Sequence, residues 1–176
     1  MEKKIVVGIT LVLLVMGLSG CTQQEDPLNG LGYVNNQHGF GMNPPEGWTT
    51  DTSGAMGLIV VFYAPINDDI RENINVLVDT LPSGFTLSSY ADSAKNQLIN
   101  YLTNGTLISS NNRTANGMNA YEYVYTYTQG IYALEGKQVI VEKNSKLILL
   151  TYTANPEDYD TYSQGLEQCL NSLKIV

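Results

Sequence analysis

The chain has 176 residues, of which 9 are basic and 17 acidic, so its formal net charge is −8. A surface this acidic repels phosphate groups, and the charge therefore argues against nucleic acid and against anionic lipid as partners. The length suits a single domain with a sizeable core. No internal repeat and no second linker interrupts the sequence after its N-terminal segment.

The first residues have the layout of a secretory signal. Lys3 and Lys4 precede an apolar run over residues 5–18. At about 1.5 Å per residue, a helix of this run is too short to cross a bilayer core of about 30 Å. We therefore predict that residues 1–20 are a signal peptide that is removed. The alternative is an ordinary cysteine beside an uncleaved anchor.

The apolar run closes on Leu18-Ser19-Gly20-Cys21, which resembles the bacterial lipobox. A thiol at this position accepts a diacylglyceryl group, and small residues before it suit the signal peptidase. We predict that Cys21 is lipidated and that residues 21–30 form a polar tether. The domain of residues 31–176 would then be exported and held by its lipid anchor in the membrane, at the outer face of the cytoplasmic membrane.

The first half of this domain predicts three strands and a helix. A short strand near residues 38–43 should stop at Pro44-Pro45, because proline cannot donate to a β-ladder. Residues 57–64 form a continuous apolar run typical of a buried strand, and residues 73–81 alternate in polarity. Apolar side chains at three- and four-residue spacing then predict a helix over residues 87–102.

The second half predicts a strand meander and a closing helix. Asn116-Gly117 indicates a hairpin, because both central positions of a type I′ turn need positive φ. Pro156 suits the first turn of a helix expected over residues 156–173. This order predicts an α+β fold with a mostly antiparallel β-sheet flanked by helices. The expected strands cover residues 106–114, 118–128, 137–143 and 147–154.

Short pieces spread over residues 31–176 resemble the PsbP-like proteins. The resemblance implies the fold of the photosystem II extrinsic protein PsbP and of the Ran-binding Mog proteins, an α/β/α sandwich. It also implies a role in binding, stabilisation or assembly without catalysis. No ligand motif of PsbP can be matched, so we carry over no ion-binding residue and expect no cofactor. The pieces are Tyr33, Gly39-Phe40, Pro44-Pro45-Glu46-Gly47-Trp48, Leu87, Tyr90-Ala91, Gly117-Met118-Asn119-Ala120-Tyr121, residues 146–154 and Ser172-Leu173-Lys174.

Two residues of types that often carry catalysis lack partners in the sequence. His38 is the only histidine, and neither a second metal ligand at short spacing nor a G-x-S-x-G motif accompanies it. Cys169 falls on the apolar stripe of the last helix, where we expect a small core residue. With Cys21 lipidated, Cys169 has no partner for an intramolecular disulfide. We therefore predict that the protein is not an enzyme.

The densest acidic cluster lies between the second and third expected strands. Asp68, Asp69 and Glu72 offer carboxylate oxygens that could bind Ca²⁺, although the EF-hand pattern is absent. A solvated loop is the alternative. No metal ligand is predicted elsewhere.

Four tyrosines are the most unusual feature of the chain. Tyr121, Tyr123, Tyr125 and Tyr127 alternate along one expected strand, so all four project to one face. An exposed aromatic face could stack on a sugar or a base, which makes these residues candidate ligand-binding residues. The alternative is a sheet face packed under a helix, with hydroxyls reaching its rim.

Asn104 and Asn112 each begin a glycosylation sequon. Used sequons would place residues 103–114 on the surface, and chance occurrence in a chain rich in asparagine and threonine is the alternative.

Three functional hypotheses follow from these observations. The leading one is a lipid-anchored, extracytoplasmic, non-catalytic binding or assembly module that meets an envelope protein. The second is an envelope lipoprotein that binds a small ligand or Ca²⁺ through the tyrosines or the acidic loop. The third is an envelope hydrolase that uses a serine, His38 and a carboxylate.

Overall fold

The computed structural model describes residues 26–67 and 69–176 of the chain. The predicted signal peptide, Cys21 and the first half of the predicted tether therefore lie outside the described residues, as does Asp68. Within the described part of the chain, no helix is both long enough and apolar enough to cross a membrane.

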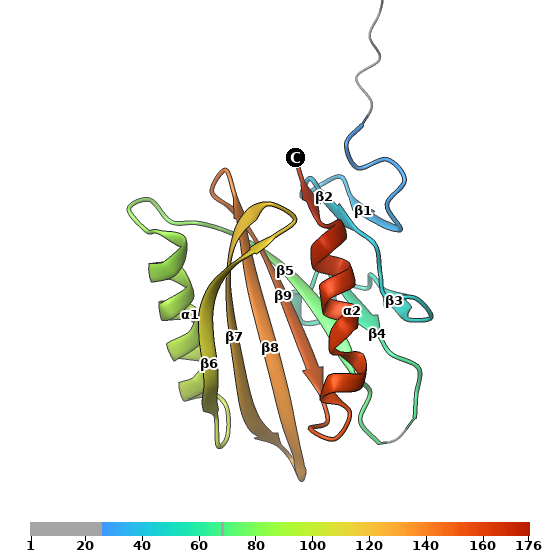
Figure 1. The fold of residues 1–176 in the computed structure, drawn as a ribbon, viewed down its shortest axis with the longest axis vertical. Coiled ribbons are helices and arrows are strands. Elements are labelled where there is room, and N and C mark those ends of the chain that lie inside the picture. The colour runs from blue at the N-terminus through green and yellow to red at the C-terminus, as the bar shows by residue number, and fades with distance from the viewer. Residues whose placement is uncertain (1–25, 68) are drawn as a thin grey trace, which may run out of the picture.

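A seven-stranded antiparallel sheet occupies the centre of the fold, with a helix on each face (Figure 1). This arrangement confirms the predicted α+β fold and its α/β/α layers. The strand order across the sheet is β3-β4-β5-β9-β8-β7-β6. The strands are β3 (Thr49–Asp51), β4 (Val60–Tyr63), β5 (Asn73–Thr80), β6 (Thr106–Ala115), β7 (Met118–Gln129), β8 (Tyr132–Lys143) and β9 (Lys146–Ala154).

Two hairpins build the long half of the sheet. β6 and β7 join through Asn116-Gly117, whose φ values of 45° and 75° confirm the predicted turn. β7 and β8 pair over their whole length, so β8 begins at Tyr132 and is longer than the predicted strand of residues 137–143. The prediction was short because glycine and charged residues interrupt the apolar pattern there, whereas the ladder to β7 continues through them.

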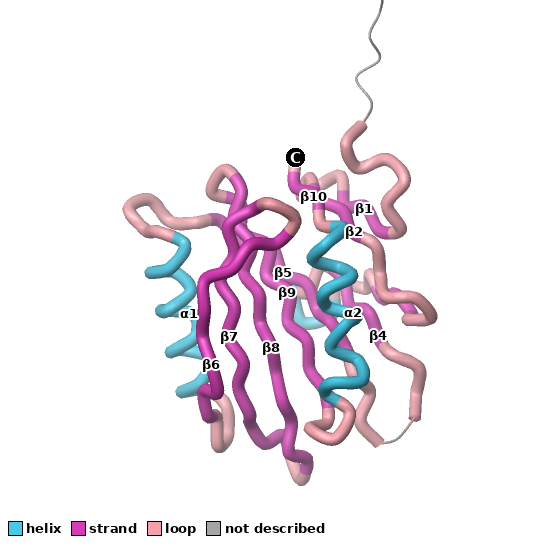
Figure 2. The backbone as a smooth tube through the Cα atoms, viewed as in Figure 1, coloured by secondary structure: helices cyan, strands magenta, loops and turns pink. Residues whose placement is uncertain are grey.

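A second, three-stranded sheet closes one end of the molecule (Figure 2). It consists of β1 (Tyr33–Asn35), β2 (Phe40–Met42) and β10 (Lys174–Ile175), with β2 in the middle. Two lysines of the large sheet hold it in place. Lys143 Nζ donates to the Ile175 carbonyl at 2.6 Å, and Lys146 Nζ donates to the His38 carbonyl at 2.7 Å.

Helix α1 (Leu87–Tyr101) begins where the sequence predicts and covers β6 and β7. Thr86 caps its N-terminus: the Thr86 hydroxyl accepts from the Ser89 amide, and the Ser89 hydroxyl accepts from the Thr86 amide. This reciprocal pair satisfies two backbone groups that a helix end leaves open. Beneath α1 lies one of two apolar clusters, made of Ala91, Tyr121, Tyr123, Tyr125, Ile140, Leu147 and Leu149.

Helix α2 (Tyr159–Ser172) covers the opposite face over β9 and β2. It begins three residues after the predicted Pro156, because the Asp158 amide bonds to the Asn155 carbonyl in a preceding turn. Gly165 lets the helix approach the proline-rich opening segment: a Cβ there would lie 3.0 Å from Cγ of Pro45. The second apolar cluster fills this side and includes Phe62, Ile74, Val139, Leu150, Leu166 and Leu170.

Gly136 provides a test of how tightly the face under α1 is packed. The Tyr125 ring lies directly over it, and a Cβ at Gly136 would come within 2.5 Å of the ring carbon Cζ. We expect Gly136→Ala to lower the free energy of unfolding by about 1–3 kcal/mol, because the ring must move. Ser109→Ala, at a partly exposed position of β6, should change it by less than about 0.5 kcal/mol. Urea unfolding measures both, and equal stability of the two variants would contradict this packing.

Candidate functional site

The tyrosine stripe lies under α1. Tyr121, Tyr123 and Tyr125 are buried, with exposed fractions of 7%, 0% and 3%, and Tyr127 is partly exposed. The sequence correctly placed all four on one face, and the alternative of a sheet face packed under a helix describes the first three. Because three of the four tyrosines are buried under α1, a ligand could reach the stripe only at the edge of the helix.

A polar chain leads from this stripe to the margin of α1. The Tyr123 hydroxyl donates to the Gln138 side-chain carbonyl, and Gln138 Nε2 donates to the Thr151 hydroxyl at 2.7 Å. Burial raises the pKa of Tyr123 well above its ordinary value, so its hydroxyl stays protonated and remains a donor. A cavity of about 350 Å³ opens here, lined by Ala94, Gln97, Leu98, Tyr101, Tyr123 and Gln138.

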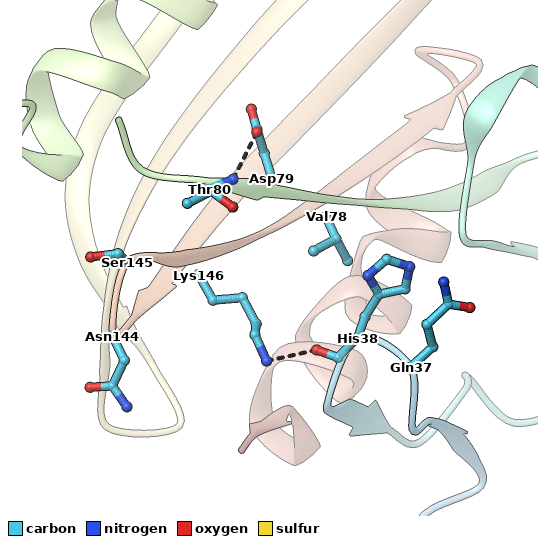
Figure 3. Close-up of a pocket in the computed structure, with 8 residues that line it drawn as sticks. All are labelled: Gln37, His38, Val78, Asp79, Thr80, Asn144, Ser145 and Lys146. Carbon is cyan, nitrogen blue, oxygen red and sulfur yellow. Dashed lines mark hydrogen bonds between the residues drawn. The ribbon is translucent and has the colours of Figure 1, made fainter. Parts of the chain in front are cut away.

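A second polar cleft surrounds the only histidine (Figure 3). It measures about 340 Å³ and lies where the small sheet meets β5 and the turn between β8 and β9. The His38 ring points toward Val78, and the Lys146 side chain reaches the His38 carbonyl. The cleft also contains Asp79 and Ser145, so the structure does bring a serine, a histidine and a carboxylate to one region.

These groups are not linked as catalysis would require. The His38 imidazole makes no hydrogen bond to any described residue, whereas a nucleophile and its base must be within hydrogen-bond reach. Asp79 instead accepts from the Tyr90 hydroxyl at 2.5 Å and from the Thr80 amide at 2.7 Å. Burial and this carboxylate raise the pKa of Tyr90. The cleft lies at the junction of the two sheets. Its geometry does not support the hydrolase hypothesis.

The acidic loop does not assemble a metal site among the described residues. Asp69 is exposed, Glu72 is buried with an exposed fraction of 1%, and Asp68 lies outside the described residues. Within residues 26–67 and 69–176 no three side chains of histidine, cysteine, aspartate or glutamate gather as metal ligands do.

Sequence reasoning missed a set of exposed apolar side chains at one end of the molecule. Ile66, Ile108 and Ile131 are 72%, 56% and 89% exposed. They belong to the β4–β5 connection, the start of β6 and the β7–β8 turn. These segments lie at the same end of the large sheet, opposite the small sheet, and β6 and β4 are on its two sides (Figure 1). The three isoleucines are far apart in the sequence, so only the fold reveals that they share an end.

The sequence profile of the DcrB family matches residues 41–172. The chain belongs to the DcrB family. Among curated proteins no sequence matches it significantly.

Solved structures show that this DcrB-family chain has the PsbP/Mog-type fold. The cyanobacterial PsbP protein CyanoP from Synechocystis is 22% identical, with a TM-score of 0.63 over 82% of this chain and 91% of that one. LpqN from Mycobacterium tuberculosis is 14% identical, with a TM-score of 0.65 over 78% and 83%. The Ran-binding protein Mog1p from Saccharomyces cerevisiae is 9% identical, with a TM-score of 0.56 over 82% and 94%. The predicted resemblance is thereby confirmed for the fold.

An ion-pair network that the sequence did not reveal ties α2 to the sheet of this DcrB-family protein. Arg113 of β6 reaches Glu122 of β7 at 2.5 Å and Glu167 of α2 at 2.8 Å. The hydrogen bond from Arg113 lowers the pKa of Glu167 below its ordinary value of 4.5. The three residues are 9 to 54 positions apart in the chain, and only the fold brings them together.

We expect this network to contribute to stability in a pH-dependent way. Because the pKa of Glu167 is lower in the folded chain, its stabilisation is present at neutral pH and is lost as the pH falls through that pKa. Glu167→Gln should cost about 0.5–1 kcal/mol at pH 7, since the side chain is 39% exposed, and the difference from wild type should be smaller at pH 3. Urea unfolding at both pH values tests this. Glu157→Gln at an exposed position is the control, and an equal loss there would contradict a specific role for Glu167.

Cys169 is a core residue of α2, as its position on the apolar stripe suggests. Its exposed fraction is 0%, and burial raises the pKa of its thiol to about 12. We expect a maleimide reagent to leave Cys169 unmodified in the folded chain at pH 7 and to modify it in urea, as mass spectrometry of the labelled peptide would show. Rapid labelling of the folded chain would contradict this burial.

Proposed function

We propose that this protein is a lipid-anchored, non-catalytic binding module of the prokaryotic envelope that docks on another envelope protein. The observation that carries the proposal is the separation of two ends. The described chain starts beside the small sheet, whereas the β4–β5 connection, the start of β6 and the β7–β8 turn lie at the opposite end (Figure 1). These segments carry the exposed isoleucines Ile66, Ile108 and Ile131. A module tethered through Cys21 would hold that apolar end away from the membrane surface.

Exposed branched aliphatic side chains at one end of the domain favour a protein partner. Covering water-exposed apolar groups with a complementary surface is favourable in free energy. The strong negative charge of the chain favours a partner with a neutral or basic surface. Proteins of the same fold support such a role: LpqN is described as involved in cell envelope biogenesis and Mog1p as Ran-binding.

The anchor can be tested separately from the docking surface. We expect cells fed an alkyne fatty acid to label the wild-type chain and not Cys21→Ser, because only a thiol accepts the diacylglyceryl group. The Cys21→Ser chain should also leave the membrane fraction. Labelling that persists in Cys21→Ser would contradict lipidation at this residue.

The docking surface is tested by site-specific photocrosslinking in cells. A photoreactive phenylalanine analogue at Ile131 should give one discrete adduct with an envelope protein. The same analogue at Val34, an exposed apolar residue of the small sheet, is the matched control and should not give that adduct. Ile66→Asp should remove the adduct at Ile131, and it should not unfold the chain because the side chain is 72% exposed. No adduct at Ile66, Ile108 or Ile131 would contradict the proposal.

A second candidate function, a small-ligand carrier, is favoured by one observation. The cavity between α1 and the sheet joins the exposed Tyr101 to the buried Tyr123 and Gln138, and its size of about 350 Å³ falls within the range of ligand sites.

A further inference from the structure

On the face of the sheet under α1, the side chains change from apolar to polar where the helix no longer covers them. Register aligns the side chains of four strands in rows, because paired residues project to the same face. One row, Tyr121, Ile140, Leu149 and Leu77, is apolar and packs with α1. The next row on the same face is Tyr123, Gln138, Thr151 and Asn75, and the row after it is Tyr125, Gly136, Thr153 and Asn73.

We name the polar members of these two rows the amide patch: Asn73, Asn75, Gln138, Thr151 and Thr153. Gln138 is nine-tenths buried, and the other four are partly exposed. No charged side chain occupies any of the eight positions of the two rows, although the chain as a whole carries a net charge of −8. A merely solvated face of such a protein would be expected to carry charges.

The patch presents hydrogen-bonding groups in fixed positions. Gln138 is held between Tyr123 and Thr151, and Asn73 Nδ2 donates to the Arg71 carbonyl at 3.2 Å. The Asn75 side-chain amide makes no hydrogen bond to any described residue, so its two donors and its acceptor remain available. Amides and hydroxyls both donate and accept, which matches ligands whose own groups do both.

Cavities adjoin the patch on two sides. The cavity of about 350 Å³ beside α1 includes Gln138 and, at its rim, Tyr101, a residue that is 90% exposed. A larger cavity of about 590 Å³ includes Asn73, Thr153 and Tyr132, and Asp69 and Arg71 also line it. Aromatic rings at the rims offer flat apolar faces on either side of a polar floor.

We propose that the amide patch binds a neutral glycan. Sugar hydroxyls donate and accept as the amides and the threonines do, and the C–H faces of sugar rings match the rims at Tyr101 and Tyr132. The five residues of the patch carry no cation, and Arg71, which lines the larger cavity, is bonded to the Ala64 carbonyl and the Thr49 hydroxyl. The net charge of −8 also disfavours an anionic polymer. A protein interface would need an apolar, well-packed centre, which this polar floor does not supply. Ile131 of the docking end also lines the cavity of about 590 Å³, whereas Gln138 and Tyr101 line the other cavity and Asn75 lines neither. Variants at Asn75 and Tyr101 therefore test the amide patch apart from the docking end.

The test uses the full chain in dodecylphosphocholine micelles, a detergent without a sugar headgroup. Maltopentaose and chitopentaose are titrated as neutral probes, with a heparin-derived hexasaccharide as the anionic probe. The side-chain amide signals of Asn75 and Gln138 are followed by NMR. We expect at least one neutral probe to shift both signals to saturation and the anionic probe to leave them unchanged.

Matched variants make the result specific. Asn75→Ala should weaken binding at least fivefold and should fold normally, because this amide makes no hydrogen bond to residues 26–67 or 69–176. Asn171→Ala, an exposed asparagine of α2 on the other face, should bind as wild type does. Tyr101→Ala should weaken binding several-fold. The proposal is overturned if neither neutral probe binds up to about 10 mM, if only the anionic probe binds, or if Asn75→Ala and Asn171→Ala bind equally.

Discussion

The two-residue alternation of β7, β8 and β9, fixed in a single register, is the constraint on which the rest of the structure depends. One set of side chains packs under α1 and the other under α2, so a one-residue slip would exchange the two sets. The pairing of Tyr125 with Gly136 favours this register, because the ring lies where a Cβ at position 136 would be. The hydrogen bond from the Tyr123 hydroxyl to Gln138 joins two residues that this register pairs across β7 and β8. The positions of both helices, the small sheet and every surface follow from it.

Local patterns were enough to predict much of this architecture. The Asn116-Gly117 turn, the start of α1 beside Thr86 and the apolar stripe that buries Cys169 depend on neighbouring residues, and the structure agrees with each. The short strands β1, β3 and β10 escaped prediction, since two or three residues show no period. Sites formed by segments that are far apart in the sequence were not predicted either. Arg113 with Glu167, and Asn75 beside Gln138, become neighbours or near neighbours only through pairing that no local pattern specifies.

The tyrosines show how a correct pattern can leave function open. Their alternation specified one face, but whether a helix covers that face depends on where α1 returns over the sheet. α1 covers the rows at Tyr121 and leaves the amides of β5 and β8 at its margin. The two helices therefore lie over different strands on opposite faces, and each leaves part of its face open. Separate surfaces on one small domain suit a module that connects components of an envelope.

The central claim is that the end of the domain with Ile66, Ile108 and Ile131 engages a partner while the opposite end faces the membrane. Hydrogen–deuterium exchange, compared between the protein in native membranes and the purified chain in micelles, tests it most directly. The account predicts slower exchange in native membranes at residues 64–67, 106–108 and 130–132, with β10 and the turn at 144–145 unchanged. Identical exchange in both preparations, or slowing confined to the small sheet, would contradict it.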